Sequence, residues 1–547
     1  MAARTLAMMI VGASGALAKT FDPLPSTANC TVNWFNQTID HFNWGPPARN
    51  PPQYTYKQRY YVYDKWWDRE HNGPIFFYFG NEDNVGLYVN HTGLMWENAE
   101  DFGALLVFAE HRFYGASKPF PDGTAGCMNW LTSEQAMADF ATLIDKLREP
   151  VAQGGLGAAK SAVIGFGGSY GGMIGSWFRL KYPNSVDGVI AASAPIWSFV
   201  GLDPPYDFES FSEGVTYDMS AAGGSAGACV ANLRKAWSAI ESAAGSAEGR
   251  KQLSQGFRTC YEIADVDDAL DLVQWAQGPW GNMAMGNYPY PSTYLMHGQS
   301  WLPAYPVRAA CEHLKDPELS GLALFEGVRA AVATQFNNTG DQTCFYNGDG
   351  ASSLSTEGGT VPRRVRMRGR KMTDPPRLVH RDEARAHGRR QRGRALQGEA
   401  NSCDGTWDYQ WCTEMVQPFT TGCGGKDFHS PCDRYNYTTS AASCQANWGV
   451  TPRELWVRQG LGGKRIQDGS NIVFSNGLMD PWHGGGILKN LSDSILAVTI
   501  PNGAHHIDLM FSNPADTPDI LAARAVERGQ MRKWVQEVAD RHARAEL

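Results

Sequence analysis

The stretch that decides the fold runs from residue 161 to residue 177 and reads SAVIGFGGSYGGMIGSW. An apolar run comes first, then residues 167–171, GGSYG, then a segment with helical character. The pentapeptide fits the pattern Gly-x-Ser-x-Gly, in which a serine stands on a strained turn between a strand and a helix. The small flanking residues let the strand and the helix approach closely. Ser169 is therefore a candidate nucleophile, and the alternative is a simple glycine-rich turn.

Short apolar segments on both sides of this turn predict a parallel β-sheet. Strand-like runs lie at 73–80, 104–108, 161–166, 189–192, 471–474 and 494–500, and helical spacing appears at 132–147, 230–244 and 520–538. Strands that alternate with helices are typical of an α/β fold. Residues 198–450 contain few strand-like runs and most of the cysteines. We expect this stretch to be an inserted, mostly helical, disulfide-tied domain, between α/β parts at 30–197 and 451–547.

The N-terminal residues have the layout of a secretory signal peptide. Residues 1–18 read MAARTLAMMIVGASGALA, with an arginine, a short apolar run and a small-residue end. The alternative is a buried N-terminal helix. Six Asn-x-Ser/Thr glycosylation signals and eleven cysteines also fit an oxidising, secretory compartment. The glycosylation signals begin at Asn29, Asn36, Asn90, Asn337, Asn436 and Asn490. No later apolar run is long enough to predict a membrane span.

Charge is segregated along the chain, whose formal net charge is −8. Residues 362–396 hold twelve arginines and one lysine against three acidic residues, a local charge of +10, so the remainder carries −18. Such a run can contact nucleic acid or another anionic surface. It also fits a disordered, solvated loop, or a segment absent from the mature protein. Because the N-terminus indicates secretion, we expect no nucleic-acid partner.

A serine nucleophile needs a base, and the base needs an acid that orients it. In α/β-hydrolases the acid and then the histidine follow the serine, each after a strand. Asp480 follows the predicted strand 471–474, and the pair His505-His506 follows the predicted strand 494–500. Loops after the carboxyl ends of parallel strands collect catalytic groups at one edge of a sheet. The pattern predicts Asp480 as the acid and leaves both histidines open as the base.

Acyl transfer also needs donors for the oxygen that becomes negative in the transition state. The backbone N–H of Tyr170, directly after the serine, is the first expected donor. The second usually comes from a loop after an early strand, where Gly80-Asn81-Glu82 stands, so we place Asn81 in this oxyanion hole. The turn lacks the glycine and lysine patterns of nucleotide sites, and the chain has no Cys-x-x-Cys pair. We expect no cofactor and no metal.

With these residues in place, the chain resembles the serine peptidase family of lysosomal prolyl carboxypeptidase and dipeptidyl peptidase II. The matching segments run in order over roughly residues 33 to 540, interrupted mainly by the arginine-rich run. They are FYFGNE (77–82), FAEHRFYGASKPF (108–120), LTSEQAMADFA (131–141), GGSYGGM (167–173), FRLKYP (178–183), AASAPIW (191–197), NYPYP (287–291), CTEM (412–415), FSNGLMDPWHGGG (474–486) and GAHHIDL (503–509).

The resemblance implies an α/β-hydrolase fold with an inserted, mostly helical cap domain, and cleavage of peptides after proline. It implies that Ser169 is the nucleophile, Asp480 the acid and His505 the base. It also implies cap disulfides between three pairs, Cys229–Cys311, Cys260–Cys344 and Cys412–Cys444. That leaves Cys30, Cys127, Cys403, Cys423 and Cys432 unassigned.

The resemblance also places substrate-binding residues. Met173 and Trp482 match positions that help to form an apolar pocket for a proline ring, with ordinary core packing as the alternative. Glu82 is placed with them in substrate binding. The chain departs from the family pattern where Asp83 replaces a glycine, where Met510 replaces an arginine, and where Gln417 replaces an apolar residue. These departures can alter substrate choice or pH dependence without removing the catalytic residues.

The leading hypothesis is a lysosomal, vacuolar or extracellular serine exopeptidase that acts on peptides after proline as a Pro-Xaa carboxypeptidase. A dipeptidyl peptidase II-like enzyme that releases Xaa-Pro dipeptides is the first alternative. An esterase or lipase with the same three residues is another. A catalytically weak, glycosylated binding protein on a hydrolase scaffold is the alternative from a different class. A homodimer is left open.

Overall fold

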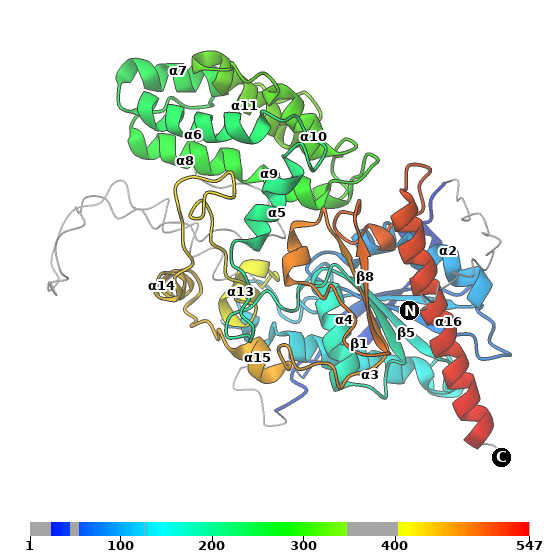
Figure 1. The fold of residues 1–547 in the computed structure, drawn as a ribbon. Coiled ribbons are helices and arrows are strands. Elements are labelled where there is room, and N and C mark those ends of the chain that lie inside the picture. The colour runs from blue at the N-terminus through cyan, green and yellow to red at the C-terminus, as the bar shows by residue number, and fades with distance from the viewer. Residues whose placement is uncertain (1–22, 44–53, 125, 347–402, 546–547) are drawn as a thin grey trace, which may run out of the picture.

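The computed structural model describes residues 23–43, 54–124, 126–346 and 403–545. The predicted signal peptide (1–18) and the arginine-rich segment (362–396) lie outside these ranges. Figure 1 shows a sheet covered by helices, with a separate group of helices standing away from it. No helix among the described residues is long and apolar enough to cross a membrane.

Eight strands form one mixed sheet in the order β1-β2-β4-β3-β5-β6-β7-β8. The pairs β1–β2 and β2–β4 are antiparallel, and the pairs from β4 to β8 are parallel. The strands are β1 (Thr31–Thr38), β2 (Thr55–Tyr63), β3 (Ile75–Phe79), β4 (Leu105–Ala109), β5 (Val163–Gly168), β6 (Gly188–Ala192), β7 (Ile472–Gly477) and β8 (Ile495–Ile500). The apolar runs predict β3 to β8. The sheet is not wholly parallel, because the two N-terminal strands, which no apolar run marks, extend it at one end.

Helices cover both faces of the sheet because the central strands are buried on both sides. Along β3, Phe76 and Tyr78 point into one apolar core, while Phe77 and Phe79 point into the other. The first core includes residues of α1 (Val85–Val89), α2 (Gly93–Phe102) and α16 (Pro518–Ala545), and the second includes residues of α3 (Ser133–Arg148) and α4 (Tyr170–Lys181). The three layers make an α/β-hydrolase fold.

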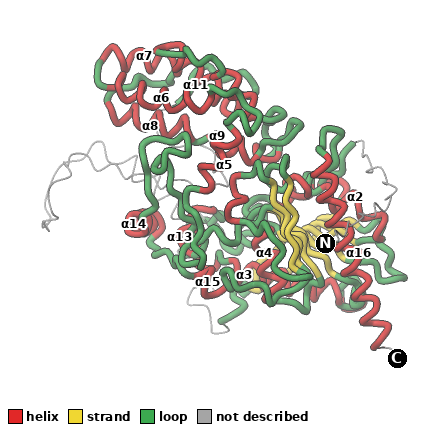
Figure 2. The backbone as a smooth tube through the Cα atoms, viewed as in Figure 1, coloured by secondary structure: helices red, strands yellow, loops and turns green. Residues whose placement is uncertain are grey.

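Between β6 and β7 the described chain is helix and loop, as Figure 2 shows by colour. This helical segment (residues 198–450) contains α5 (Ser210–Asp218), α6 (Cys229–Ala244), α7 (Ala247–Phe257), α8 (Val266–Gln277), α9 (Pro279–Met285), α10 (Pro306–Cys311), α11 (Gly321–Phe336), α13 (Trp407–Thr413) and α14 (Tyr437–Trp448). The short α15 (Trp456–Gly460) follows it. Side chains that begin helices here include Ser246 and Asp265, whose oxygens accept from backbone N–H groups of α7 and α8.

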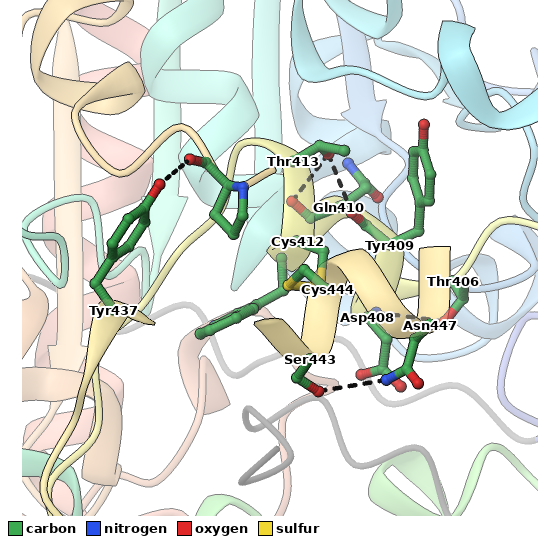
Figure 3. Close-up of a disulfide and its surroundings, with 12 residues drawn as sticks. Thr406, Asp408, Tyr409, Gln410, Cys412, Thr413, Tyr437, Ser443, Cys444 and Asn447 are labelled. Atoms are coloured by element: carbon green, nitrogen blue, oxygen red, sulfur yellow. Dashed lines mark hydrogen bonds between the residues drawn. A yellow bond between two sulfur atoms is a disulfide. The ribbon is translucent and has the colours of Figure 1, made fainter. Parts of the chain in front are cut away.

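Five disulfides occur among the described residues: Cys127–Cys403, Cys229–Cys311, Cys260–Cys344, Cys412–Cys444 and Cys423–Cys432. Three are the pairs that the resemblance implies, and the other two use four of the five cysteines left unassigned. The fifth, Cys30, is a free thiol. Cys127–Cys403 ties the helical segment to the loop before α3, and Cys412–Cys444 ties α13 to α14 (Figure 3).

Candidate active site

The turn after β5 holds Ser169 in a conformation that side-chain-bearing residues rarely adopt, with φ 55° and ψ −127°. Its backbone N–H donates to the carbonyl of Ala192 in β6 at 3.0 Å. The strand and the helix can approach this closely because glycines stand at the contact. A Cβ at Gly167 would lie 2.2 Å from the carbonyl oxygen of Gly171. The predicted elbow is thus a strained strand-to-helix turn in which small residues are sterically required.

The acid and the first histidine meet beyond the ends of β7 and β8. Nδ1 of His505 lies 2.7 Å from Oδ2 of Asp480, and both side chains are fully buried. The other carboxylate oxygen of Asp480 accepts from the backbone N–H of Trp482 at 3.1 Å. The helical segment supports the histidine loop, because the His505 N–H donates to the Met285 carbonyl and the Tyr288 hydroxyl donates to the His505 carbonyl.

The second histidine has a different environment. The backbone N–H of His506 donates to Oγ of Ser193 at 2.8 Å, and its ring packs edge-on against Tyr294. A Cβ at Gly168 would lie 2.7 Å from Cδ2 of this ring, so His506 fills the space behind the serine turn. Burial, helped by the nearby His505, holds the pKa of His506 well below its usual range. Of the two histidines that the sequence leaves open, His505 is the one that contacts Asp480.

The expected oxyanion loop lies against the first turn of α4. Asn81 follows β3 and is fully buried, and a Cβ at Gly171 would lie 3.1 Å from its Oδ1. Its Nδ2 has no hydrogen-bond partner among the described residues. Tyr170 begins α4, and the first N–H groups of a helix have no acceptor within the helix. Glu82 of the same loop, Ser169 and Tyr170 all line one pocket.

Sequence reasoning missed a buried polar network that holds the Tyr170 side chain. The Tyr170 hydroxyl lies 2.7 Å from Oγ of Ser133 and accepts from Nε2 of Gln410 at 2.8 Å. Oε1 of Glu414 accepts from both the backbone N–H and the hydroxyl of Ser133, at 2.7 and 2.9 Å. Burial raises the pKa of Glu414 to about 7, and the Ser133 hydrogen bonds oppose that rise. The segments 131–141 and 412–415, which carry part of the resemblance, contain Ser133 and Glu414.

A small pocket opens beside the serine. It is lined by Glu82, Ser169, Tyr170, Met173, Pro195, Trp407, Gln417 and Trp482. The Trp482 ring packs edge-on against Phe211 and Phe419 of the helical segment, with centroid distances of 4.8 and 5.5 Å. The structure thus brings Met173, Trp482 and Glu82 together with Ser169, and adds Pro195, Trp407 and Gln417. Trp407 begins α13, which Figure 3 shows fastened through Cys412 to α14.

Two residues that differ from the family pattern, Asp83 and Met510, make contacts in the structure. Oδ2 of Asp83 lies 2.5 Å from Nδ1 of His297, which links the Asn81 loop to the helical segment. Met510 stands where the family pattern has an arginine, and its side chain is buried. The guanidinium next to this turn belongs instead to Arg524 of α16. It donates to the carbonyls of Met510, Ile507 and Asp508.

The six asparagines of the predicted glycosylation signals differ in exposure. Asn29, Asn36, Asn90, Asn436 and Asn490 are exposed, and Asn337 is partly exposed. Within the described ranges no group of three or more His, Cys, Asp or Glu side chains is arranged to hold a metal ion.

Comparison with known proteins gives the class that this fold and site define. The family model for serine carboxypeptidase S28 matches residues 37–360 and 376–527. The chain belongs to this family of serine peptidases. The "Lysosomal Pro-X carboxypeptidase" of Homo sapiens and that of Pongo abelii are each 37% identical to it over 522 residues, covering 94% of this chain and 91% of the relative. "Prolyl carboxy peptidase like protein 5" of Caenorhabditis elegans is 34% identical over 486 residues, covering 86% of this chain and 84% of the relative.

Proposed function

We propose that this protein is a Pro-Xaa carboxypeptidase of the lysosome or the wider secretory pathway. The observation that carries the proposal is the pocket beside Ser169, in which Met173, Pro195 and Trp482 offer flat apolar surfaces for a pyrrolidine ring. The relatives named for Pro-X carboxypeptidase activity support the same choice.

In the proposed mechanism Ser169 attacks the carbonyl of the prolyl residue, and His505 takes the serine proton. The Asp480 carboxylate, 2.7 Å from Nδ1 of His505, fixes the tautomer in which Nε2 carries no proton and can act as the base. The N–H of Tyr170 and the Asn81 loop stabilise the oxygen that becomes negative. His505 returns the proton to the leaving amino acid, and water then hydrolyses the prolyl acyl-enzyme.

We also propose that the helical segment (198–450) acts as a cap that completes the site. Trp407 and Gln417 from this segment line the pocket, and Met285 and Tyr288 hold the backbone of His505. The pocket therefore has walls from both the sheet domain and the cap. A cap of this kind limits access to the serine, which suits an exopeptidase that acts on chain ends.

Buried carboxyl groups support an acidic working compartment. Asp508, in the turn after the histidine pair, and Glu527 of α16 are both buried. Burial raises the pKa of Asp508 and holds that of Glu527 well above its usual range. Burial likewise holds the pKa of Asp218, near Asp480, well above its usual range. Each of these groups favours the folded state at acidic pH. The predicted signal peptide and glycosylation sites agree with passage through the secretory pathway.

Two substrates test the proposed reaction at acidic and neutral pH. Purified protein is incubated with benzyloxycarbonyl-Pro-Phe and, separately, with Lys-Pro-aminomethylcoumarin. We expect release of phenylalanine from the first and no fluorescence from the second. Fluorescence without phenylalanine would assign dipeptidyl peptidase activity instead. If neither product forms while simple acyl esters are hydrolysed, the proline specificity is wrong.

A further inference from the structure

The pocket beside Ser169 contains one amide side chain among largely apolar neighbours. Gln417 is 1% exposed and lines the pocket together with Met173, Pro195 and Trp482. An apolar proline ring gives an amide nothing to bond with. The position of this amide therefore bears on which residue the pocket accepts.

Neighbouring hydrogen bonds fix the orientation of the amide. The Ser198 hydroxyl donates to the carbonyl of Pro195 at 2.7 Å, so its one proton is committed. Oγ of Ser198 can then only accept, and it accepts from Nε2 of Gln417 at 2.8 Å. Were the amide flipped, two acceptor oxygens would face each other. The Gln417 backbone carbonyl is also held, because Nε1 of Trp411 donates to it at 3.2 Å.

The oxygen of the Gln417 amide has no hydrogen-bond donor beside it. Oε1 of Gln417 is buried and has no hydrogen-bond partner among the described residues. A second pocket residue has an unpaired donor: Nε1 of Trp407 is buried and has no acceptor within the described ranges. A hydroxyl group can donate to an acceptor such as Oε1 of Gln417 and can also accept from a donor such as Nε1 of Trp407. A ring methylene can do neither.

We propose that Gln417 determines specificity by selecting a hydroxylated pyrrolidine, 4-hydroxyproline, over proline at the residue whose carbonyl Ser169 attacks. This inference rests on the proposed post-proline activity and names its substrate class. The hydroxyl of the substrate donates to Oε1 of Gln417, whereas bound proline leaves that oxygen buried and unpaired. A site built to bond a substrate hydroxyl discriminates strongly against the analogue that lacks it.

The test compares two substrates on the full-length protein: benzyloxycarbonyl-Pro-Phe and benzyloxycarbonyl-(4-hydroxy)Pro-Phe. For the wild type we expect kcat/KM to be on the order of ten-fold higher for the hydroxyproline substrate. In Gln417→Met, whose side chain is of similar length and apolar, we expect the ratio to fall to one or below. The ratio of the two kcat/KM values, measured on one protein preparation, does not change if part of the protein is unfolded. The ratio for the wild type tests the proposal even if Gln417→Met fails to fold.

Distinct outcomes separate this inference from the proposed function. Hydrolysis of both substrates with a wild-type ratio of one or less overturns the role of Gln417 and leaves post-proline cleavage standing. A wild-type preference that Gln417→Met leaves unchanged also overturns it. If neither substrate is hydrolysed, the proposed function fails and the inference fails with it. Ser198→Ala, which frees the amide to rotate, should reduce the preference as Gln417→Met does.

Discussion

Nδ1 of His505 lies 2.7 Å from Oδ2 of Asp480, with both groups buried beyond the ends of neighbouring strands β8 and β7. The two residues are 25 positions apart in the chain, and the sheet brings them together. The same edge of the sheet presents Ser169 after β5 and the Asn81 loop after β3. Four loops from one edge therefore supply every group that the proposed mechanism uses.

Replacing the acid tests whether this contact has the proposed role. Asp480→Asn preserves the shape of the side chain but favours the wrong tautomer of His505, so we expect kcat to fall roughly 10⁴-fold with little loss of folding. Hydrolysis of benzyloxycarbonyl-Pro-Phe and circular dichroism measure the two effects. Asp64→Asn, at an exposed ion pair with Arg69, is the matched control and should keep full activity. Equal activity of the two variants would exclude Asp480 from catalysis.

The elbow glycines should tolerate no side chain. In Gly167→Ala the new Cβ would lie 2.2 Å from a backbone oxygen, so the turn must move, which typically costs about 1–3 kcal/mol in overpacked sites. We expect a lower melting temperature and loss of activity. Gly227→Ala, where no atom lies within 4 Å of the added Cβ, is the control and should melt near the wild type. A Gly167→Ala protein with normal activity would mean that Ser169 needs no such turn.

Glu414 should make the folded state more stable in acid. Burial raises its pKa to about 7, whereas a glutamate in the unfolded chain titrates near 4.3. The folded state therefore holds a proton that the unfolded state releases, and this stabilisation is complete below about pH 4 and lost as the pH rises through 7. The difference between the two pKa values corresponds to about 4 kcal/mol.

Glu414→Gln removes the titrating group while keeping an acceptor for Ser133. Urea unfolding at pH 4.5 and pH 8 should therefore show a smaller difference in the free energy of unfolding for the variant than for the wild type. Other buried carboxyls, such as Asp508 and Glu527, keep part of the pH dependence in both proteins. An identical pH dependence of the two proteins would show that folding does not raise the pKa of Glu414.

Removing the Cys412–Cys444 disulfide should destabilise the protein more than removing Cys423–Cys432. The first closes a loop of 32 residues and the second a loop of 9 residues. Loop-closure entropy predicts losses of about 3–4 and about 2–3 kcal/mol in the respective double Cys→Ser variants. The first variant should also raise KM. That disulfide holds α13 (Figure 3), and Trp407, the first residue of α13, lines the pocket. An unchanged KM would separate α13 from substrate binding.

The parallel part of the fold was predictable because its strands are buried on both faces and read as continuous apolar runs. β1 and β2 were not predicted, because some of their inward-pointing positions carry polar residues. Gln37 and Gln58 are fully buried, and their side chains bond to each other at 2.9 Å across the two strands. Without apolar alternation, a strand of this kind has no signal in a single sequence.

Part of the candidate site was also predictable from the sequence. Ser169, Asp480 and the histidine pair follow strands in a fixed order, so their positions could be inferred from local patterns. The contacts of Gln417 with Ser198, and of Ser133 with Glu414, join residues more than 200 positions apart. Such pairs depend on how the helical segment folds back over the sheet, which local patterns do not specify. Local patterns did not choose between His505 and His506; the resemblance implied His505, and the three-dimensional contact with Asp480 agrees with it.

Labelling with a fluorophosphonate, followed by peptide mass spectrometry, tests the central claim most directly. Such probes form a covalent bond with a serine that a neighbouring base activates. We predict one adduct, on Ser169, that disappears in Ser169→Ala and is strongly reduced in His505→Ala. Equal labelling of the wild type and Ser169→Ala would contradict the assignment of Ser169 as the nucleophile.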